Sequence, residues 1–370
     1  MADTYIIAEI GTAHQGDASR ARELISAARE SGADCAKFQY VIADEIVHPS
    51  TGRVALPGGS IPLYERFRAL EQPAEFYAGL QAACTAEGVD FLCTPFGLES
   101  ARSLRALEPR ALKIASPELN HTALLNELSG YHLPLIVSTD VSTLADIEYA
   151  LSILDRESVT LLHCITAYPA PEEEYNLRLI PTLSHVFGVP VGLSDHSEEP
   201  NLVPGLAVAL GATVVEKHFT LSREGDGLDD PIAMDPVMFT QMSATIRRID
   251  AIRSLDREHG GARVIAEFEQ EYGSARVRVV LGDGVKRLAA REAGYYRTTR
   301  RSLRAARDVE RGDVFEARDL LALRSETLEP GLEPRWADLV VGARASRPVR
   351  AGAPITWDCL LDAPESRLKP

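Results

Sequence analysis

The 370-residue sequence predicts an α/β fold: a (β/α)8 TIM barrel followed by a small β-rich domain. Eight short apolar runs alternate with helix-like stretches over roughly the first 250 residues, which is typical of this barrel. The composition then changes after about residue 255, which indicates a second unit. The eight runs cover residues 5–11, 35–40, 91–96, 111–116, 134–139, 159–166, 190–196 and 214–219.

The stretches between these runs carry helix signals. Residues 18–32 show helical periodicity and end at Gly32, a typical C-cap. Asp235 followed by Pro236 gives a later helix its N-cap and its first residue. The segment around 41–72 is long and rich in Gly and Pro, which in a barrel is typical of a functional loop. An open doubly wound sheet is the competing fold, but no GxGxxG turn follows the first run.

Three regions follow from this pattern. Residues 1–255 form the predicted catalytic barrel, and 256–300, rich in Arg and Gly with weak periodicity, are interpreted as a linker. Residues 301–362 form the predicted small β-rich domain. Within it, RDVERG at 307–312 resembles RPVRAG at 347–352, which suggests two similar hairpin units.

Composition excludes several classes of function. Acidic residues outnumber basic ones by 54 to 39, a net charge of −15, which argues against nucleic acid as the main partner. No apolar run approaches the roughly 20 residues of a spanning helix, and no basic segment opens a signal peptide. The five cysteines include no CxxC, so neither a disulfide framework nor a zinc cluster is expected. We therefore expect a cytoplasmic protein with reduced thiols and no membrane partner.

Lysine is rare in this chain. Only five of the 39 basic residues are lysines, and Lys37, Lys113 and Lys217 lie inside apolar runs. A buried charge is costly unless it is paired, so these three lysines need a carboxylate partner or a ligand. Glu9 and Glu216 are candidate partners.

Polar residues end nearly every apolar run, where the active sites of barrels lie. Lys37 and Gln39, Ser194 and His196, and Glu216 and His218 are each two residues apart, so each pair faces one side of its strand. Lysines with hydroxyls suit a compact anion such as a phosphate with a carboxylate. Two histidines near Glu216 could hold a divalent metal. Each residue also has a structural interpretation: core histidines with hydrogen bonds, lysines in ion pairs, and Ser or Thr in turns.

Several segments together carry a resemblance to a known family. They read AEIGTAHQGD (8–17), GADCAKFQ (32–39), FLCTPF (91–96), KIASPELN (113–120), LIVSTDVST (135–143), LLHCITAYPAP (161–171), NLRLI (176–180), VGLSDHS (191–197), GATVVEKHFTL (211–221) and RRSLRAARDVERGDVF (300–315). In this order they resemble the sialic acid synthase family, the phosphoenolpyruvate-dependent nonulosonate (N-acetylneuraminate) synthases. The barrel match covers about residues 5–250, and the rest resembles the family's C-terminal antifreeze-like (SAF) domain.

The resemblance implies a reaction and a set of roles. Phosphoenolpyruvate condenses through C3 with the aldehyde of an N-acylmannosamine-type or related amino-hexose, and phosphate leaves by C–O cleavage. The implied phosphoenolpyruvate-binding residues are Lys37, Thr94, Lys113, Ser116, Ser138 and Ser194. The implied catalytic acids are Glu9, Glu216 and Asp229, the implied metal ligands are His196 and His218, and the implied sugar contacts are Phe96, Tyr168 and Arg324. The resemblance also implies Mn²⁺ as the metal and a homodimer in which the SAF domain caps the partner's barrel.

Five positions depart from the family's usual motifs: Ala13, Gln15, Gly97, Asp140 and Thr166. They fall mostly where the sugar or the cap would lie, so the sequence does not choose between free, 6-phosphorylated and dideoxy-diacetamido sugars. Two other functions stay open. One is a class I aldolase with Lys113 or Lys217 as the Schiff-base nucleophile, and the other is a sugar- or anion-binding protein without turnover.

Overall fold

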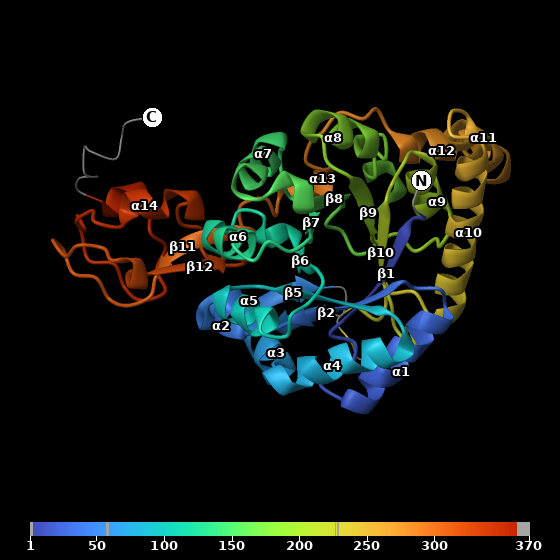
Figure 1. Cartoon of the computed structure of the whole chain (residues 1–370). Helices are drawn as coiled ribbons and strands as arrows, with labels where there is room; N and C mark the ends of the chain where they lie inside the picture. The colour runs from blue at the N-terminus through green and yellow to red at the C-terminus, as the bar shows by residue number, and fades with distance from the viewer. Residues whose placement is uncertain (1–2, 57–58, 226, 228, 361–370) are drawn as a thin grey trace.

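The computed structural model describes residues 3–56, 59–225, 227 and 229–360 (Figure 1). Its centre is a parallel sheet of eight strands that curves into a nearly closed barrel, which confirms the predicted fold class. The strand order is β5-β2-β1-β10-β9-β8-β7-β6, and the end strands β5 and β6 contact each other. The strands are β1 (Tyr5–Gly11), β2 (Cys35–Tyr40), β5 (Asp90–Pro95), β6 (Leu112–Ile114), β7 (Leu135–Ser138), β8 (Val159–His163), β9 (Val191–Asp195) and β10 (Val214–His218).

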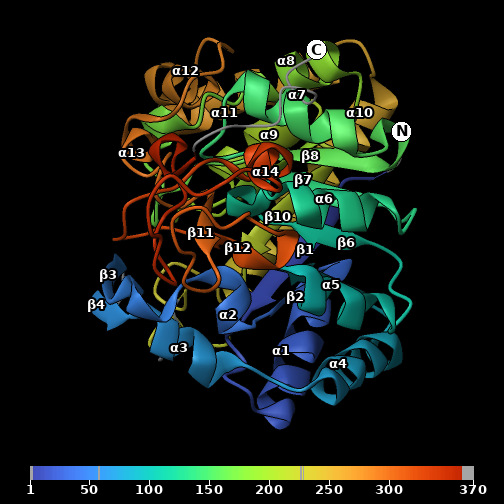
Figure 2. The same ribbon diagram turned by 90° about the vertical axis from the view of Figure 1, so that its left-hand side faces the viewer.

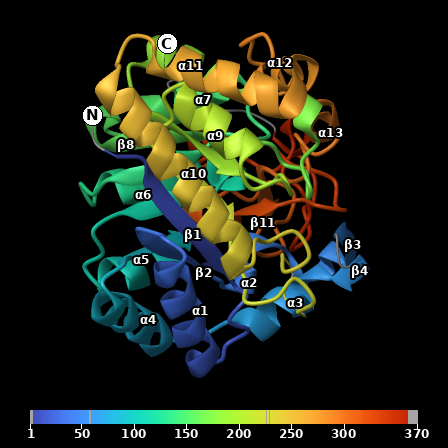
Figure 3. The same cartoon turned by 90° about the vertical axis from the view of Figure 1, so that its right-hand side faces the viewer.

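Helices surround the barrel, and α10 crosses its outer side in Figure 3. The predicted N-cap Asp235 accepts the backbone N–H of Met238, and Gly32, with a φ of 92°, directly follows the C-cap Ser31 of the first helix. Asp17, which was not predicted, caps that helix by accepting the backbone N–H groups of Ser19 and Arg20. The barrel helices are α1 (Ala18–Glu30), α4 (Ala74–Glu87), α5 (Leu98–Arg105), α6 (Thr122–Ser129), α7 (Leu144–Ile153), α8 (Leu179–Phe187), α9 (Leu202–Ala209) and α10 (Pro236–Leu255). Short 3-10 turns are η2 (Ser116–Glu118), η3 (Arg156–Ser158) and η4 (Glu172–Glu174). Within the described residues, none of the helices is both long and apolar enough to span a bilayer.

The interior of the barrel is built in layers. At the amino ends of the strands it is filled by an apolar layer consisting of Ile7, Cys35, Leu92, Ile136, Leu162 and Val214. Two residues further along these strands, the period-two alternation of strands brings polar side chains into the same interior. The apolar layer therefore forms a water-free floor beneath the polar residues.

Gly192 on β9 packs directly against two residues of this floor, Leu162 and Val214. A Cβ at this position would lie 2.8 Å from Cδ2 of Leu162 and 2.8 Å from Cβ of Val214. We expect Gly192→Ala to lower the free energy of unfolding by roughly 1–3 kcal/mol, because the packed floor cannot expand without strain. Gly79→Ala is the matched control: it lies in α4 with nothing near its Cβ position, so the same change should be neutral or stabilising. Urea denaturation of both variants tests this, and an equal effect of the two changes would contradict it.

The long segment between β2 and β5 has structure of its own. It contains α2 (Ala43–Ile46), the turn η1 (Pro49–Thr51), the hairpin β3 (Arg53–Leu56) with β4 (Gly59–Pro62), and α3 (Leu63–Leu70). Val41, Ile46, Val47 and Leu63 pack with Phe96 in a small apolar cluster. The segment thus packs against the end of β5, next to the mouth of the barrel.

The segment 256–300, interpreted above as a linker, carries α11 (Gly260–Phe268), the π-helical turn η5 (Glu269–Gly273), α12 (Ser274–Leu281) and α13 (Ala290–Ala293). Phe268 and Val280 are fully buried in the core of the barrel unit. This segment is therefore packed against the barrel over much of its length before it reaches the C-terminal module.

The C-terminal module has its own small core, centred on Leu303, Phe315 and Ile355. The two similar segments found in the sequence pair with each other, because Val309 and Val349 exchange two backbone hydrogen bonds in an antiparallel bridge. Figure 2 shows the module in front of the barrel. Its elements are β11 (Arg301–Ala305), η6 (Ala317–Asp319), β12 (Leu320–Arg324), η7 (Pro334–Trp336), α14 (Ala337–Val340) and η8 (Trp357–Cys359). Residues 361 and 362 of the predicted domain lie outside the described residues.

Candidate active site

Lys37 lies at the centre of a buried charge cluster above the apolar floor. Its Nζ is 2.8 Å from Oε2 of Glu9 on β1 and 3.6 Å from Oε2 of Glu216 on β10. Burial opposes the charge of Lys37, but the two carboxylates outweigh it and raise the pKa of the lysine. Gln39, on the same face of β2, donates a 2.7 Å hydrogen bond to Glu9. Lys37 is thus a lysine in a buried ion pair, as the structural interpretation predicts, and it also lies where an anion-binding lysine is expected.

Lys113 on β6 is the second lysine of the interior, and it has no carboxylate in direct contact among the described residues. Its Nζ donates to Oγ of Ser138 at 2.6 Å and to the carbonyl of Ile114 at 3.1 Å. Burial, together with the nearby charge of Lys37, lowers the pKa of Lys113, although Glu216 opposes the shift. A dianionic ligand would supply the negative charge that this lysine lacks.

Hydroxyls from three strands lie near the two lysines. Ser194 on β9 donates a 3.0 Å hydrogen bond to Glu216, and both Lys113 and Lys37 lower the pKa of that carboxyl against the effect of burial. Ser116 accepts a 3.2 Å hydrogen bond from the backbone of Asp140. Thr94 on β5 is buried, and its hydroxyl has no hydrogen-bond partner within the described part of the chain. The hydroxyls of Ser116 and Thr94 are therefore donors available to an anion, whereas that of Ser194 is engaged with Glu216.

The two predicted metal ligands meet at the carboxyl ends of β9 and β10. The rings of His196 and His218 lie 5.4 Å apart between centroids, and Tyr168 contacts them at 4.3 Å and 6.1 Å respectively. Asp229 lies 3.6 Å from Nδ1 of His218. Tyr168 follows β8, His196 follows β9, and His218 and Asp229 lie at the end of β10 and in the loop after it. The fold therefore brings together residues that are far apart in the sequence.

The donor chemistry of the histidine pair fits a divalent metal. Nδ1 of His196 donates to the carbonyl of Ile165 at 2.8 Å, which leaves Nε2 with its lone pair, as in metal-ligating histidines. Burial, followed by the neighbouring His218, lowers the pKa of His196 to about 3, so the ring is neutral. Within the described residues, no group of three His, Cys, Asp or Glu side chains is arranged to hold a metal. A metal on this pair would have to take its remaining ligands from substrate or water.

A buried network on the outer side of β9 and β10 supports His196. Asp195 accepts hydrogen bonds from Nζ of Lys217 at 2.6 Å, from the hydroxyl of Tyr175, and from the backbone and hydroxyl of Ser197, each at 2.8 Å. The Tyr175 hydroxyl also accepts the backbone N–H of His196 at 3.0 Å. The backbone N–H groups of His196 and Ser197 are therefore held by Tyr175 and Asp195, and Asp195 is in turn paired with Lys217.

This network also decides the orientation of Lys217. Being one residue from both Glu216 and His218, it lies on the opposite face of β10, paired with Asp195 and 1% exposed. Lys217 is therefore wrongly placed to be a Schiff-base nucleophile in the barrel interior. The sequence shows this already through the period-two alternation.

Phe96 and Arg324 form a second cluster, around Glu118. Arg324, at the end of β12, donates to Oε1 of Glu118 at 2.8 Å, and its guanidinium lies 5.4 Å from the ring centroid of Phe96. Arg301 on β11 also pairs with Glu118 at 2.8 Å, and both residues are fully buried. In this single chain the C-terminal module therefore contacts the barrel of its own chain, and sequence reasoning did not anticipate Glu118.

Among the departures from the family motifs, Gly97 has a clear structural reason. Gly97 leaves room for Glu45 of α2, because a Cβ at position 97 would lie 2.8 Å from the Cβ of Glu45. The Glu45 carboxylate accepts the backbone N–H groups of Glu99 and Ser100 at the start of α5. Ala13 is largely buried and Gln15 is exposed with a φ of 49°. Neither has a further explanation in the structure.

Asp140 and Thr166 contact each other, and sequence reasoning missed their neighbours. The Thr166 hydroxyl donates to Oδ2 of Asp140, and its backbone N–H donates to Glu292 of α13 at 2.9 Å. Lys286, from the loop before α13, donates to the carbonyl of Thr139 at 3.2 Å. The rarity of lysine was a signal that could have identified Lys286.

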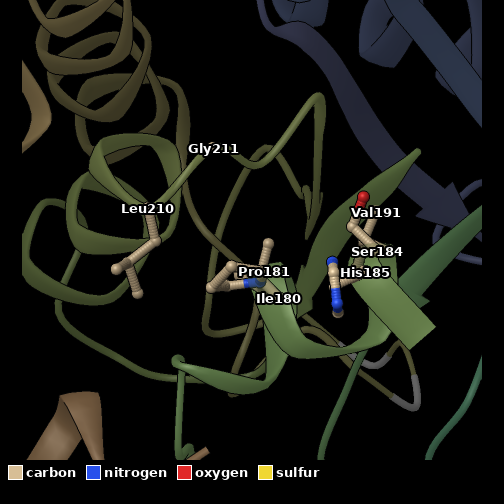
Figure 4. Close-up of a pocket in the computed structure, with 7 residues that line it drawn as sticks. All are labelled: Ile180, Pro181, Ser184, His185, Val191, Leu210 and Gly211. Atoms are coloured by element: carbon tan, nitrogen blue, oxygen red, sulfur yellow. The ribbon is translucent and has the colours of Figure 1, made fainter. Parts of the chain in front are cut away.

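Figure 4 shows a pocket away from these residues. It is lined by Ile180, Ser184 and His185 of α8 and by Val191, Leu210 and Gly211, at the amino end of the strands. Barrel active sites lie at the opposite end. None of the predicted site residues lines this pocket.

Comparisons with known proteins place this chain in a family. Residues 24–256 match the NeuB family, and residues 300–361 match the SAF domain. The chain is 33% identical to the spore coat polysaccharide biosynthesis protein SpsE of Bacillus subtilis, over 97% of this chain and 94% of that protein. It is 32% identical to the N,N'-diacetyllegionaminic acid synthase of Legionella pneumophila, over 96% and 94% respectively. The crystal structure of SpsE superposes with a TM-score of 0.82, covering 98% of this chain and 96% of that one.

Proposed function

Because this chain belongs to the NeuB family of synthases, we propose that it condenses phosphoenolpyruvate with an amino-hexose to form a nonulosonic acid. The observation that carries this proposal is the pair of buried lysines, Lys37 and Lys113, on a dry floor with hydroxyl donors around them. A barrel has no structural need for two buried cations at this depth, since buried charges are costly without partners. A compact trianion with phosphate and carboxylate groups matches this donor set.

The proposed reaction consists of the following bond changes, in which three acidic residues take part. C3 of phosphoenolpyruvate bonds to the aldehyde carbon of the open-chain sugar, whose oxygen takes a proton. Water then adds to C2 and loses one proton. The C2–O bond to phosphate breaks as the new C2 hydroxyl loses its proton, which the departing phosphate takes, and the ketone is left. Glu9, beside Lys37, is the proposed acid/base at C2, and Glu216 and Asp229 are the proposed proton and hydroxyl contacts on the sugar side.

His196 and His218 are the proposed ligands of a divalent metal, with Mn²⁺ as the first candidate. When bound, such a metal polarises a carbonyl group. Tyr168, against both rings and 37% exposed, is the proposed wall of the sugar subsite. Phe96 and Arg324 are the proposed further sugar contacts, on the side where the module meets the barrel.

We also propose that the protein acts in the cytoplasm as a homodimer. Since the SAF module binds Glu118 of its own barrel through Arg301 and Arg324, capping of the partner's barrel would require the subunits to exchange these contacts. Its five cysteines are all free and buried, which suits a reducing compartment. Size-exclusion chromatography with light scattering tests the dimer, and a monomer at working concentration would contradict it.

The test of the function is phosphate release from phosphoenolpyruvate with Mn²⁺, across a panel of amino-hexoses, with and without EDTA. The panel contains N-acetylmannosamine, its 6-phosphate, and dideoxy-diacetamido hexoses. We expect release that depends on one of these sugars and stops with EDTA. Binding of phosphoenolpyruvate without release for any sugar would instead support a binding protein without turnover.

One observation favours a second candidate, the class I aldolase. The lowered pKa of Lys113 is a property that a Schiff-base lysine needs. Borohydride in the presence of a carbonyl substrate would trap such an intermediate and add mass to the peptide carrying Lys113. We expect no trapped adduct, because Lys113 serves as an anion-binding group.

A further inference from the structure

Asp140 lies near Tyr168, the proposed wall of the sugar subsite, whose pKa is raised first by burial and then by nearby acidic groups, Asp140 among them. It follows Ser138 by two residues, so its position continues the inward-facing series of β7. Its backbone N–H donates to Ser116 at 3.2 Å, next to the proposed phosphoenolpyruvate site. Only 5% of the residue is exposed.

The Asp140 carboxylate is only half satisfied. Oδ2 accepts a hydrogen bond from the Thr166 hydroxyl, whereas Oδ1 is buried and has no hydrogen-bond partner in the described part of the chain. A buried acceptor without a donor is costly and is rare in folded proteins. Burial and the nearby Glu292 raise the pKa of Asp140 to about 6, which is the expected result of such incomplete pairing. Oδ1 is therefore positioned for a donor that a ligand brings.

The cations described around this carboxylate are already engaged. Lys37 pairs with Glu9 and Glu216, and Lys113 donates to Ser138 in the proposed phosphoenolpyruvate site. Lys286 donates to the carbonyl of Thr139 beside two acidic groups, Asp140 and Glu292. Arg324 pairs with Glu118. A phosphate group on the acceptor would thus meet the carboxylates of Asp140 and Glu292, and the nearby cation Lys286 already faces both of them.

We propose that Asp140 is a specificity-determining residue, which accepts a hydrogen bond from an N–H or O–H group of the acceptor and favours an amino-hexose without a phosphate. This inference rests on the proposed function and names the acceptor class: an uncharged acylamino-hexose. Thr166 and Glu292 act as positioning residues, because they hold the carboxylate and the loop after β8 in place. The like charge of Asp140 and the acceptor phosphate supplies the discrimination.

The experiment measures kcat/KM for N-acetylmannosamine, or the best neutral acceptor of the panel, and for the corresponding 6-phosphate. It compares wild type, Asp140→Asn and Asp140→Gly at one saturating phosphoenolpyruvate concentration, so that effects on phosphoenolpyruvate cancel in the ratio. We expect wild type to prefer the neutral acceptor. Asp140→Asn, which removes the charge and keeps the shape, should raise the phosphorylated-to-neutral ratio at least about 10-fold. Asp140→Gly should in addition lower kcat/KM for the neutral acceptor about 10-fold.

Asp283→Asn is the matched control. It removes a carboxylate from the loop that carries Lys286, but Asp283 is exposed and pairs with Arg287 at the surface. This variant should leave the ratio as in wild type. A wild-type preference for the 6-phosphate, or an equal ratio in wild type and both Asp140 variants, would overturn the inference while leaving the proposed function intact. No phosphate release by wild type with any acceptor would overturn the proposed function, and the inference with it.

Discussion

Replacing Lys113 or Lys37 by methionine is expected to lower kcat/KM for phosphoenolpyruvate roughly 100-fold, mainly through KM. Each change removes a charged donor to the phosphate or carboxylate in a buried site, where such hydrogen bonds are worth about 1.5–3 kcal/mol. The two variants differ in stability. Lys37→Met leaves Glu9 and Glu216 without their cation, which should cost about 3–5 kcal/mol of unfolding free energy, whereas Lys113 has no such ion pair.

Steady-state kinetics and urea denaturation of both variants separate these two effects. Arg110→Met is the control, because Arg110 is a surface residue whose side chain is 88% exposed. This control should keep wild-type kinetics. Wild-type kinetics in both lysine variants would show that the anion site lies elsewhere.

Replacing His196 by alanine is expected to weaken Mn²⁺ binding by roughly 100-fold or more. The ring is neutral, its Nδ1 is held by Ile165, and its Nε2 is free to ligate, so the variant loses one of two imidazole donors. Loss of a supporting partner alone typically costs 10- to 100-fold in metal affinity, and loss of the ligand itself should cost at least the upper end of that range. Titration of free Mn²⁺ by electron paramagnetic resonance measures this without any substrate.

His185→Ala provides the comparison, since His185 is an exposed histidine of α8 at the other end of the barrel. It should bind Mn²⁺ as the wild type does. Equal affinity in the His196 variant and the wild type would show that the histidine pair is not the metal site, whatever its effect on turnover.

The eight strand runs were predictable from sequence because each is a short apolar segment bounded by turns and helices. Long-range pairing confirms all eight, and the floor of Ile7, Leu92 and Val214 explains why apolar residues begin each strand. The helices of residues 260–293 were harder to predict, because charged and glycine residues interrupt their periodicity. Tertiary burial of Phe268 and Val280 specifies them instead.

The sequence by itself determined the barrel, the chemical types of the site residues and the face on which each lies, because strand alternation is a local property of the backbone. Only the tertiary structure decided which residues become partners: Lys37 with Glu9 and Glu216, Arg324 with Glu118, and Asp140 with Thr166. Such contacts join strand ends that are far apart in the chain, so no local pattern carries them. Closure of the barrel brings these strand ends together. Because the interior has a low dielectric constant, the partner of each buried group then strongly affects whether that group is charged.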